Sequence, residues 1–63
     1  GYANYEWFLK QNLKDYSGKW IVIINQKIVA DGNNVNQLIE ETKKRFPNDK
    51  PLITKVRSKW SIL

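Results

Sequence analysis

The side chains that most often carry out chemistry in proteins are missing from this sequence of 63 residues, which contains no histidine and no cysteine. Histidine is the commonest general base, and the cysteine thiolate is intrinsically very nucleophilic. The same absence removes the residues on which zinc sites depend. We therefore expect no metal site and no cofactor.

Six acidic residues remain as candidates for acid–base catalysis. They are scattered over predicted helices and turns: Glu6, Asp15, Asp31, Glu40, Glu41 and Asp49. None of them is placed like the paired carboxylates of a hydrolytic cleft, and no glycine-rich phosphate loop is present. We expect a protein that is not an enzyme and that has no small-molecule substrate.

Basic residues are concentrated in the last third of the chain. The formal net charge is +5, and residues 43–63 carry a single acidic residue, Asp49. Such an asymmetry favours a polyanion or an acidic protein as the partner. In a DNA- or RNA-binding protein, the phosphate-contacting residues would be Lys43, Lys44, Arg45, Lys50, Lys55, Arg57 and Lys59. The alternative is that strand lysines prevent edge-to-edge aggregation and helix-end cations stabilise the helix dipole.

Two tryptophans stand apart from the predicted core. Trp7 falls on the far side of its helix from the apolar stripe, and Trp60 lies in a C-terminal tail with Ile62 and Leu63. Tryptophan is enriched at interface hot spots, so these four residues are our candidate anchors for a partner protein, with residues 57–63 as a docking tail. Two alternatives stay open: the tail folds back onto its own core, or a rotated helix buries Trp7.

One apolar strand must organise these candidates. The five consecutive apolar residues Trp20–Ile24 are typical of a strand that is covered on both faces. A second β-branched run, residues 27–30, follows after Asn25 and Gln26, which predicts a hairpin. A two-residue loop of type I′ needs positive φ at both positions, which glutamine tolerates poorly.

The register of this hairpin follows from a two-residue loop. Its cross-strand pairs would be Ile23 with Ile28, Val22 with Val29, and Ile21 with Ala30.

Two helices and a third strand complete the prediction. The first helix spans residues 4–16, with Asn4 as its N-cap and a buried stripe made of Tyr5, Phe8, Leu9, Leu13 and Tyr16. The second helix spans residues 35–46, is capped by Asn34, and buries Val35, Leu38, Ile39, Thr42 and Phe46. Residues 52–57 alternate between apolar and polar side chains, as a half-exposed strand does.

These elements predict one α+β domain over residues 1–63 with the order α-β-β-α-β. A right-handed crossover places the first strand in the middle of a three-stranded sheet of order 2-1-3. We expect both helices on one face of this sheet and the other face open, or covered by a partner.

The sequence resembles a family of short archaeal and bacterial domains of unknown function. The resemblance covers about residues 5–56 and lies in the runs YSGKWIVII (16–24), IVADG (28–32) and PLITKV (51–56). They are similar to the family patterns Y-x-G-K-W-V-A-I-V, V-V-A-x-G and P-L-I-x-K-V. The chain departs from them at Asn25-Gln26, where relatives usually carry Asp-Gly or Asn-Gly, and in its 58–63 tail. The family implies no catalytic residues.

The leading functional prediction is a small basic accessory subunit that docks on a larger protein. Its size and charge, and the archaeal character of the resemblance, are similar to the small accessory subunits of archaeal replicative DNA polymerases. Direct DNA or RNA binding and an antitoxin-like role are the alternatives. No apolar segment approaches the roughly 18–20 residues of a membrane span, so we expect a cytoplasmic protein without membrane contact.

Overall fold

The structure is a computed structural model that describes residues 2–57 of the chain. Its elements are α1 (Tyr2–Lys10), the 3-10 helix η1 (Lys14–Tyr16), β1 (Trp20–Ile24), β2 (Lys27–Gly32), α2 (Val35–Arg45) and β3 (Leu52–Lys55). This order confirms the predicted α+β class, with η1 as an addition.

Strand β1 lies in the middle of the sheet. The strand order is β2-β1-β3, and both neighbours run antiparallel to β1, which confirms the predicted order 2-1-3. Residues Ile21–Ile24 are buried, with Ile21, Val22 and Ile23 at 0% exposure. The run of large apolar side chains therefore forms a strand that is covered on both faces, as its composition indicates.

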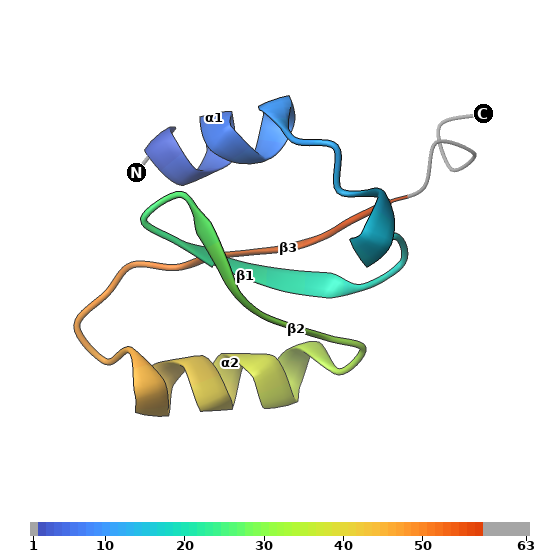
Figure 1. The fold of residues 1–63 in the computed structure, drawn as a ribbon. Coiled ribbons are helices and arrows are strands. Elements are labelled where there is room, and N and C mark those ends of the chain that lie inside the picture. Colours follow the sequence, from blue (N-terminus) through green and yellow to red (C-terminus); the bar gives the residue numbers. More distant parts are fainter. Residues whose placement is uncertain (1, 58–63) are drawn as a thin grey trace.

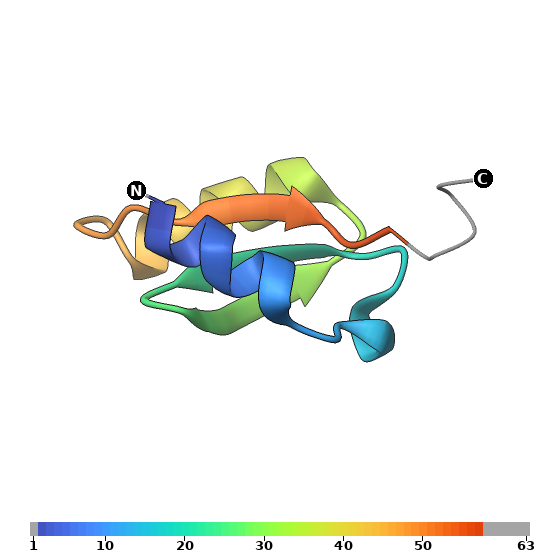
Figure 2. The ribbon, with the colours of Figure 1, turned by 90° about the horizontal axis from the view of Figure 1, so that it is seen from above.

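The two helices cover opposite faces of the sheet, so the prediction that both lie on one face is wrong (Figure 1). One core cluster contains Ile21, Ile23 and Val56, with side chains of α1, of η1 and of the segment between them packed against it: Trp7, Phe8, Leu13 and Tyr16. The other contains Val22, Ile24 and Leu38, with Phe46 packed against it. Successive strand residues point to opposite faces, so an all-apolar central strand requires cover on both. Seen from above, α1 crosses over the sheet (Figure 2).

Helix α1 is shorter than predicted and is rotated about its axis. It ends at Lys10, and Leu13 and Tyr16 reach the core from η1 and the segment before it. Trp7 and Phe8 face the sheet, whereas Tyr5 and Leu9 are 49% and 61% exposed. The predicted stripe is wrong for these two residues because it extended one helical period across a break in the helix.

The hairpin has the predicted two-residue loop. Asn25 and Gln26 have φ values of 51° and 61°, so both residues occupy the left-handed region that a type I′ turn requires. Ile23 pairs with Ile28 as predicted, but Val22 pairs with Ala30 because β2 contains a bulge.

The bulge lies at Val29 and changes the register of the remaining pairs. The predicted pairs of Val22 with Val29 and of Ile21 with Ala30 are therefore wrong by one residue. Val29 and Ala30 both pack on the α2 side of the sheet, which regular alternation would not allow.

Helix α2 and strand β3 agree closely with prediction. The Asn34 side chain accepts a 3.2 Å hydrogen bond from the backbone N–H of Gln37, and Leu38 and Thr42 are buried. Leu52 and Val56 pack on the α1 side, and Ile53 packs on the α2 side.

A second bulge joins β1 to the end of β3. The backbone N–H of Gly18 donates to the Val56 carbonyl at 2.7 Å, and the Val56 N–H donates to the Lys19 carbonyl at 2.8 Å. Gly18 has a φ of 80°, the conformation in which glycine opens a G1 bulge. The glycine therefore places β1 and β3 in register.

Candidate functional site

Trp7 is part of the protein's own core. It is half-buried and packs against the cluster of Ile21, Ile23 and Val56. The reason for naming it as a partner anchor, an orientation away from the sheet, is therefore wrong. The other predicted anchors, Trp60, Ile62 and Leu63, lie outside the described residues, and their role stays a prediction.

The outer side of α1 carries the apolar surface that the sequence interpretation missed. Tyr5 and Leu9 are the exposed large hydrophobic residues of the described chain, at 49% and 61% exposure. They are four residues apart and therefore adjacent on one side of the helix, with the exposed Glu6 and Lys10 beside them. Trp7 is the signal in the sequence that could have identified Tyr5 and Leu9 as exposed. Tyr5 and Leu9 lie on the opposite side of the helix from Trp7, so a helix that buries this large ring turns both of them outward.

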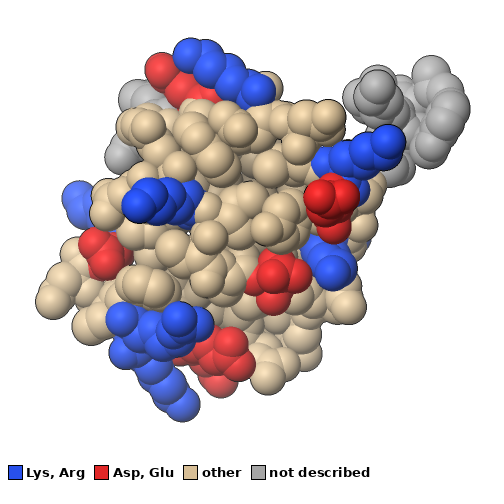
Figure 3. Space-filling model, in the orientation of Figure 1, with Lys and Arg blue, Asp and Glu red and all other residues tan. Residues whose placement is uncertain are grey.

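The predicted basic residues are exposed but do not gather into one patch. Lys43, Lys44 and Arg45 end α2, and Lys50 lies in the loop that follows. Lys55 ends β3 and Arg57 follows it, roughly 10 Å and 17 Å from Leu52 along the chain at about 3.3 Å per residue. On the face that Figure 3 shows, basic and acidic side chains are interspersed with uncharged surface. Lys59 lies outside the described residues.

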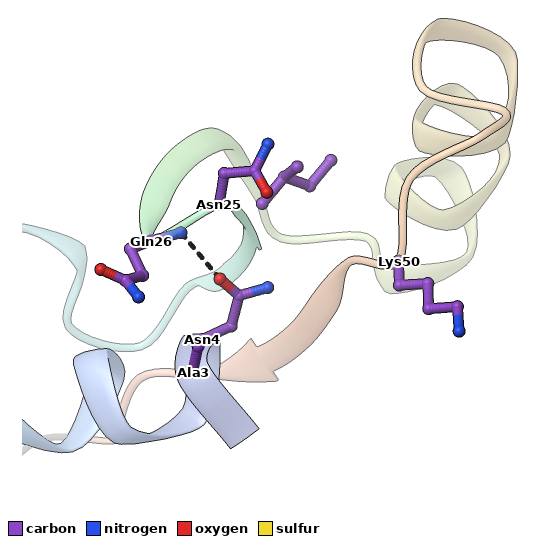
Figure 4. Close-up of a pocket in the computed structure, with 6 residues that line it drawn as sticks. Ala3, Asn4, Asn25, Gln26 and Lys50 are labelled. Atoms are coloured by element: carbon purple, nitrogen blue, oxygen red, sulfur yellow. Dashed lines mark hydrogen bonds between the residues drawn. The ribbon is translucent and has the colours of Figure 1, made fainter. Parts of the chain in front are cut away.

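A hollow of ≈ 470 Å³ lies between the start of α1 and the hairpin loop. Asn4 reaches into the hairpin from α1: its Oδ1 accepts from the Gln26 N–H at 2.7 Å (Figure 4). Its Nδ2 donates to the Ile23 carbonyl at 3.2 Å. Asn4 is therefore a bridge between two elements, and its prediction as an N-cap is wrong. Lys50 lies across the hollow, with its side chain extending away from Asn4 (Figure 4).

The side chains that line this hollow offer hydrogen-bonding groups and the positive charge of Lys50. Both polar atoms of Asn4 are engaged in holding the fold together, and the remaining polar side chains that line it are Asn25, Gln26 and Lys50. Within residues 2–57, no three acidic residues come together in a set that could hold a metal ion.

A second hollow, of ≈ 320 Å³, is more apolar and separates α2 from the start of β3. Its lining consists of Ile39, Thr42, Lys43, Phe46, Pro47, Asp49, Pro51 and Ile53. Apolar side chains from the helix and the strand thus face a shared groove, with one lysine and one aspartate among them. This arrangement can receive an apolar side chain, and its lysine and aspartate can attract or repel charged residues that flank this side chain in a ligand.

Comparison with known proteins places the chain in a family. The model of DUF5678, a family of unknown function, matches residues 11–59, a range that contains η1, the hairpin, α2 and β3 and begins directly after α1. Neither the curated proteins nor the solved structures contained a match. No helix among the described residues is long and apolar enough to cross a membrane. The match spans most of the chain and confirms the predicted resemblance: this protein belongs to DUF5678, a family of unknown function.

Proposed function

We propose that this protein is a non-catalytic binding module that docks on a larger partner protein through the outer side of α1. The observation that carries the proposal is that α1 has apolar side chains on two sides. Trp7 and Phe8 hold it on the sheet, and Tyr5 and Leu9 project away from the sheet. Single exposed apolar residues are common. An adjacent pair on a helix whose other side already packs on the sheet can serve as a docking surface for a partner.

The charge of the chain supports an acidic partner. A protein of net charge +5 attracts negatively charged surfaces over about a Debye length, roughly 8 Å at physiological ionic strength. Such steering raises the association rate more than the affinity. A cytoplasmic nucleic-acid-processing complex, such as an archaeal DNA polymerase, is the partner class that we propose, with Trp60, Ile62 and Leu63 as additional anchors.

Affinity capture from native lysate followed by reconstitution tests this proposal. The baits are the wild type, a Tyr5→Ser/Leu9→Ser double variant, and a chain that lacks residues 58–63. We expect the double variant to remain folded but not to capture the protein that the wild type captures. In the reconstitution, the purified partner should bind the wild type and not the double variant. Unchanged capture by a folded double variant would show that α1 is not the docking surface.

The nucleic-acid alternative gives a different result in the same experiment. Binding to unrelated DNA or RNA should then fall steeply with salt and disappear in a Lys55→Glu/Arg57→Glu variant. The Tyr5→Ser/Leu9→Ser variant would keep that binding.

A further inference from the structure

Strand β3 presents an open edge. It is the last strand of the order β2-β1-β3, and within residues 2–57 no further strand pairs with its outer side. Val56 directs both its N–H and its carbonyl toward the segment that leads into β1, where they bond to Lys19 and Gly18. Because the direction of backbone groups alternates along an antiparallel strand, the groups of Ile53, Lys55 and Arg57 point to the open edge.

The apolar groove runs beside this open edge. Ile53 contributes its backbone to the edge and its side chain to the groove, and Ile39 and Phe46 of the α2 region line the groove from the other side. A strand edge and a helix with a groove between them are the elements that domains use when an extended peptide adds to a sheet. The added backbone pairs with the strand, and alternate side chains enter the groove.

The charges around the groove define the ligand. Lys43 lines it, and Lys55 is exposed two residues beyond Ile53 on the same edge. Asp49 also lines the groove, after the C-terminal end of α2, and its negative charge repels an acidic ligand. We therefore place the acidic residues of the ligand near Lys43 and Lys55 and away from Asp49. A second copy of this chain is disfavoured as the occupant because each copy carries a net charge of +5.

We propose that β3 and α2 form a peptide-binding groove for an extended acidic segment of a partner protein. The segment adds to the open edge of β3 as a fourth strand and inserts an apolar side chain between Ile53 and Phe46. This proposal does not depend on docking through α1, because the groove lies on the other face of the sheet.

An NMR titration of the ¹⁵N-labelled chain of residues 1–63 tests the proposal. The probe is a synthetic octapeptide of serine and threonine with one central leucine and a glutamate two residues to either side of it, so that the leucine and both glutamates lie on the same face of the added strand. The control peptide has lysine in place of glutamate. With the acidic peptide, we expect saturable shifts and slower hydrogen exchange at the amides of Ile53, Lys55 and Arg57. Equal binding of both peptides, or shifts confined to α1, would overturn the proposal.

Two neighbouring lysines provide a matched pair of variants. Lys43 lines the groove, whereas Lys44 is exposed on the same helical turn and does not line it. Lys43→Glu should weaken binding of the acidic peptide by about tenfold, and Lys44→Glu by less than about threefold, because the repulsion falls with distance and screening. Equal losses in the two variants would show that only net charge matters and would overturn the groove.

A proline variant tests the backbone contribution. Lys55→Pro removes an amide that points to the open edge and leaves the bonds between Val56 and the segment before β1 intact. If the variant keeps the wild-type amide spectrum outside β3, peptide binding should be lost, and retained binding would exclude strand addition. If the variant does not fold, the exchange rates of the wild-type amides decide the same question. The Tyr5→Ser/Leu9→Ser variant separates the two proposals, since peptide binding should persist in it.

Discussion

Replacing Asn4 by aspartate removes one hydrogen-bond donor and should loosen α1 from the hairpin. The Asn4 Nδ2 donates to the Ile23 carbonyl at 3.2 Å, whereas an aspartate would place a negatively charged oxygen there. The bond from the Gln26 N–H to Oδ1, at 2.7 Å, can be kept by the substituted side chain. The change therefore isolates the donor side of the bridge.

The size of the effect follows from two opposing contributions. A hydrogen bond of this kind contributes about 0.5–1.5 kcal/mol net to stability. In the variant, the partly buried Ile23 carbonyl faces a carboxylate that cannot donate to it, which destabilises the fold further. A negative charge in the first turn of a helix returns about 0.3–1 kcal/mol through the helix dipole. We expect Asn4→Asp to lower the free energy of unfolding by about 1 kcal/mol, a substantial part of the roughly 3–5 kcal/mol typical of a chain this small.

Urea unfolding at neutral pH, followed by tryptophan fluorescence, measures this change. With a urea dependence of about 1 kcal/mol per molar, the midpoint should fall by about 1 M. Asn12→Asp is the matched control, because Asn12 is exposed and lies between α1 and η1, and its midpoint should barely move. If Asn4 were an N-cap, aspartate would serve equally well, so an unchanged or raised midpoint for Asn4→Asp would refute the bridge.

Three further predictions concern the backbone and the orientation of α1, and urea midpoints measure all of them. Gln26→Gly should stabilise the protein by about 0.5–1 kcal/mol, because glycine adopts the φ of 61° without the strain of a side chain; a lowered midpoint would contradict this. Gly18→Ala should cost about 1–2 kcal/mol although an added Cβ meets nothing within 4 Å, since the φ of 80° alone carries the penalty; an unchanged midpoint would contradict the bulge. Trp7→Ala should cost about 2 kcal/mol or more and Leu9→Ala less than about 0.5 kcal/mol, and the reverse order would show that α1 is oriented as its sequence periodicity predicted.

Elements with strong local signals were predictable. The helix from Val35 is started by Asn34, whose side chain bonds to an amide three residues away, so a short stretch of sequence is sufficient to locate it. The hairpin loop at Asn25-Gln26 is likewise marked by the break between two β-branched runs. The sheet order followed from connection rules, which depend on element order and not on side-chain detail.

The candidate surfaces were less predictable because they depend on which side of an element faces inward. The helical period predicts Tyr5 and Leu9 in the core and Trp7 on the surface, whereas in the structure Tyr5 and Leu9 are exposed and Trp7 packs on the sheet. A helix of nine residues offers too few positions for its period to define one side. The bonds of Asn4 to the hairpin, made across 19 and 22 residues of sequence, support the observed orientation.

The sequence by itself determined that the chain is a small α+β domain around Trp20–Ile24, because five adjacent apolar side chains are stable only when both faces of their strand are covered. It also determined the absence of histidine and cysteine chemistry. The tertiary structure alone decided that the helices lie on opposite faces, that α1 turns Tyr5 and Leu9 outward, and that an apolar groove lies beside the open edge of β3. Those features arise from contacts between residues far apart in the chain, which no local pattern encodes.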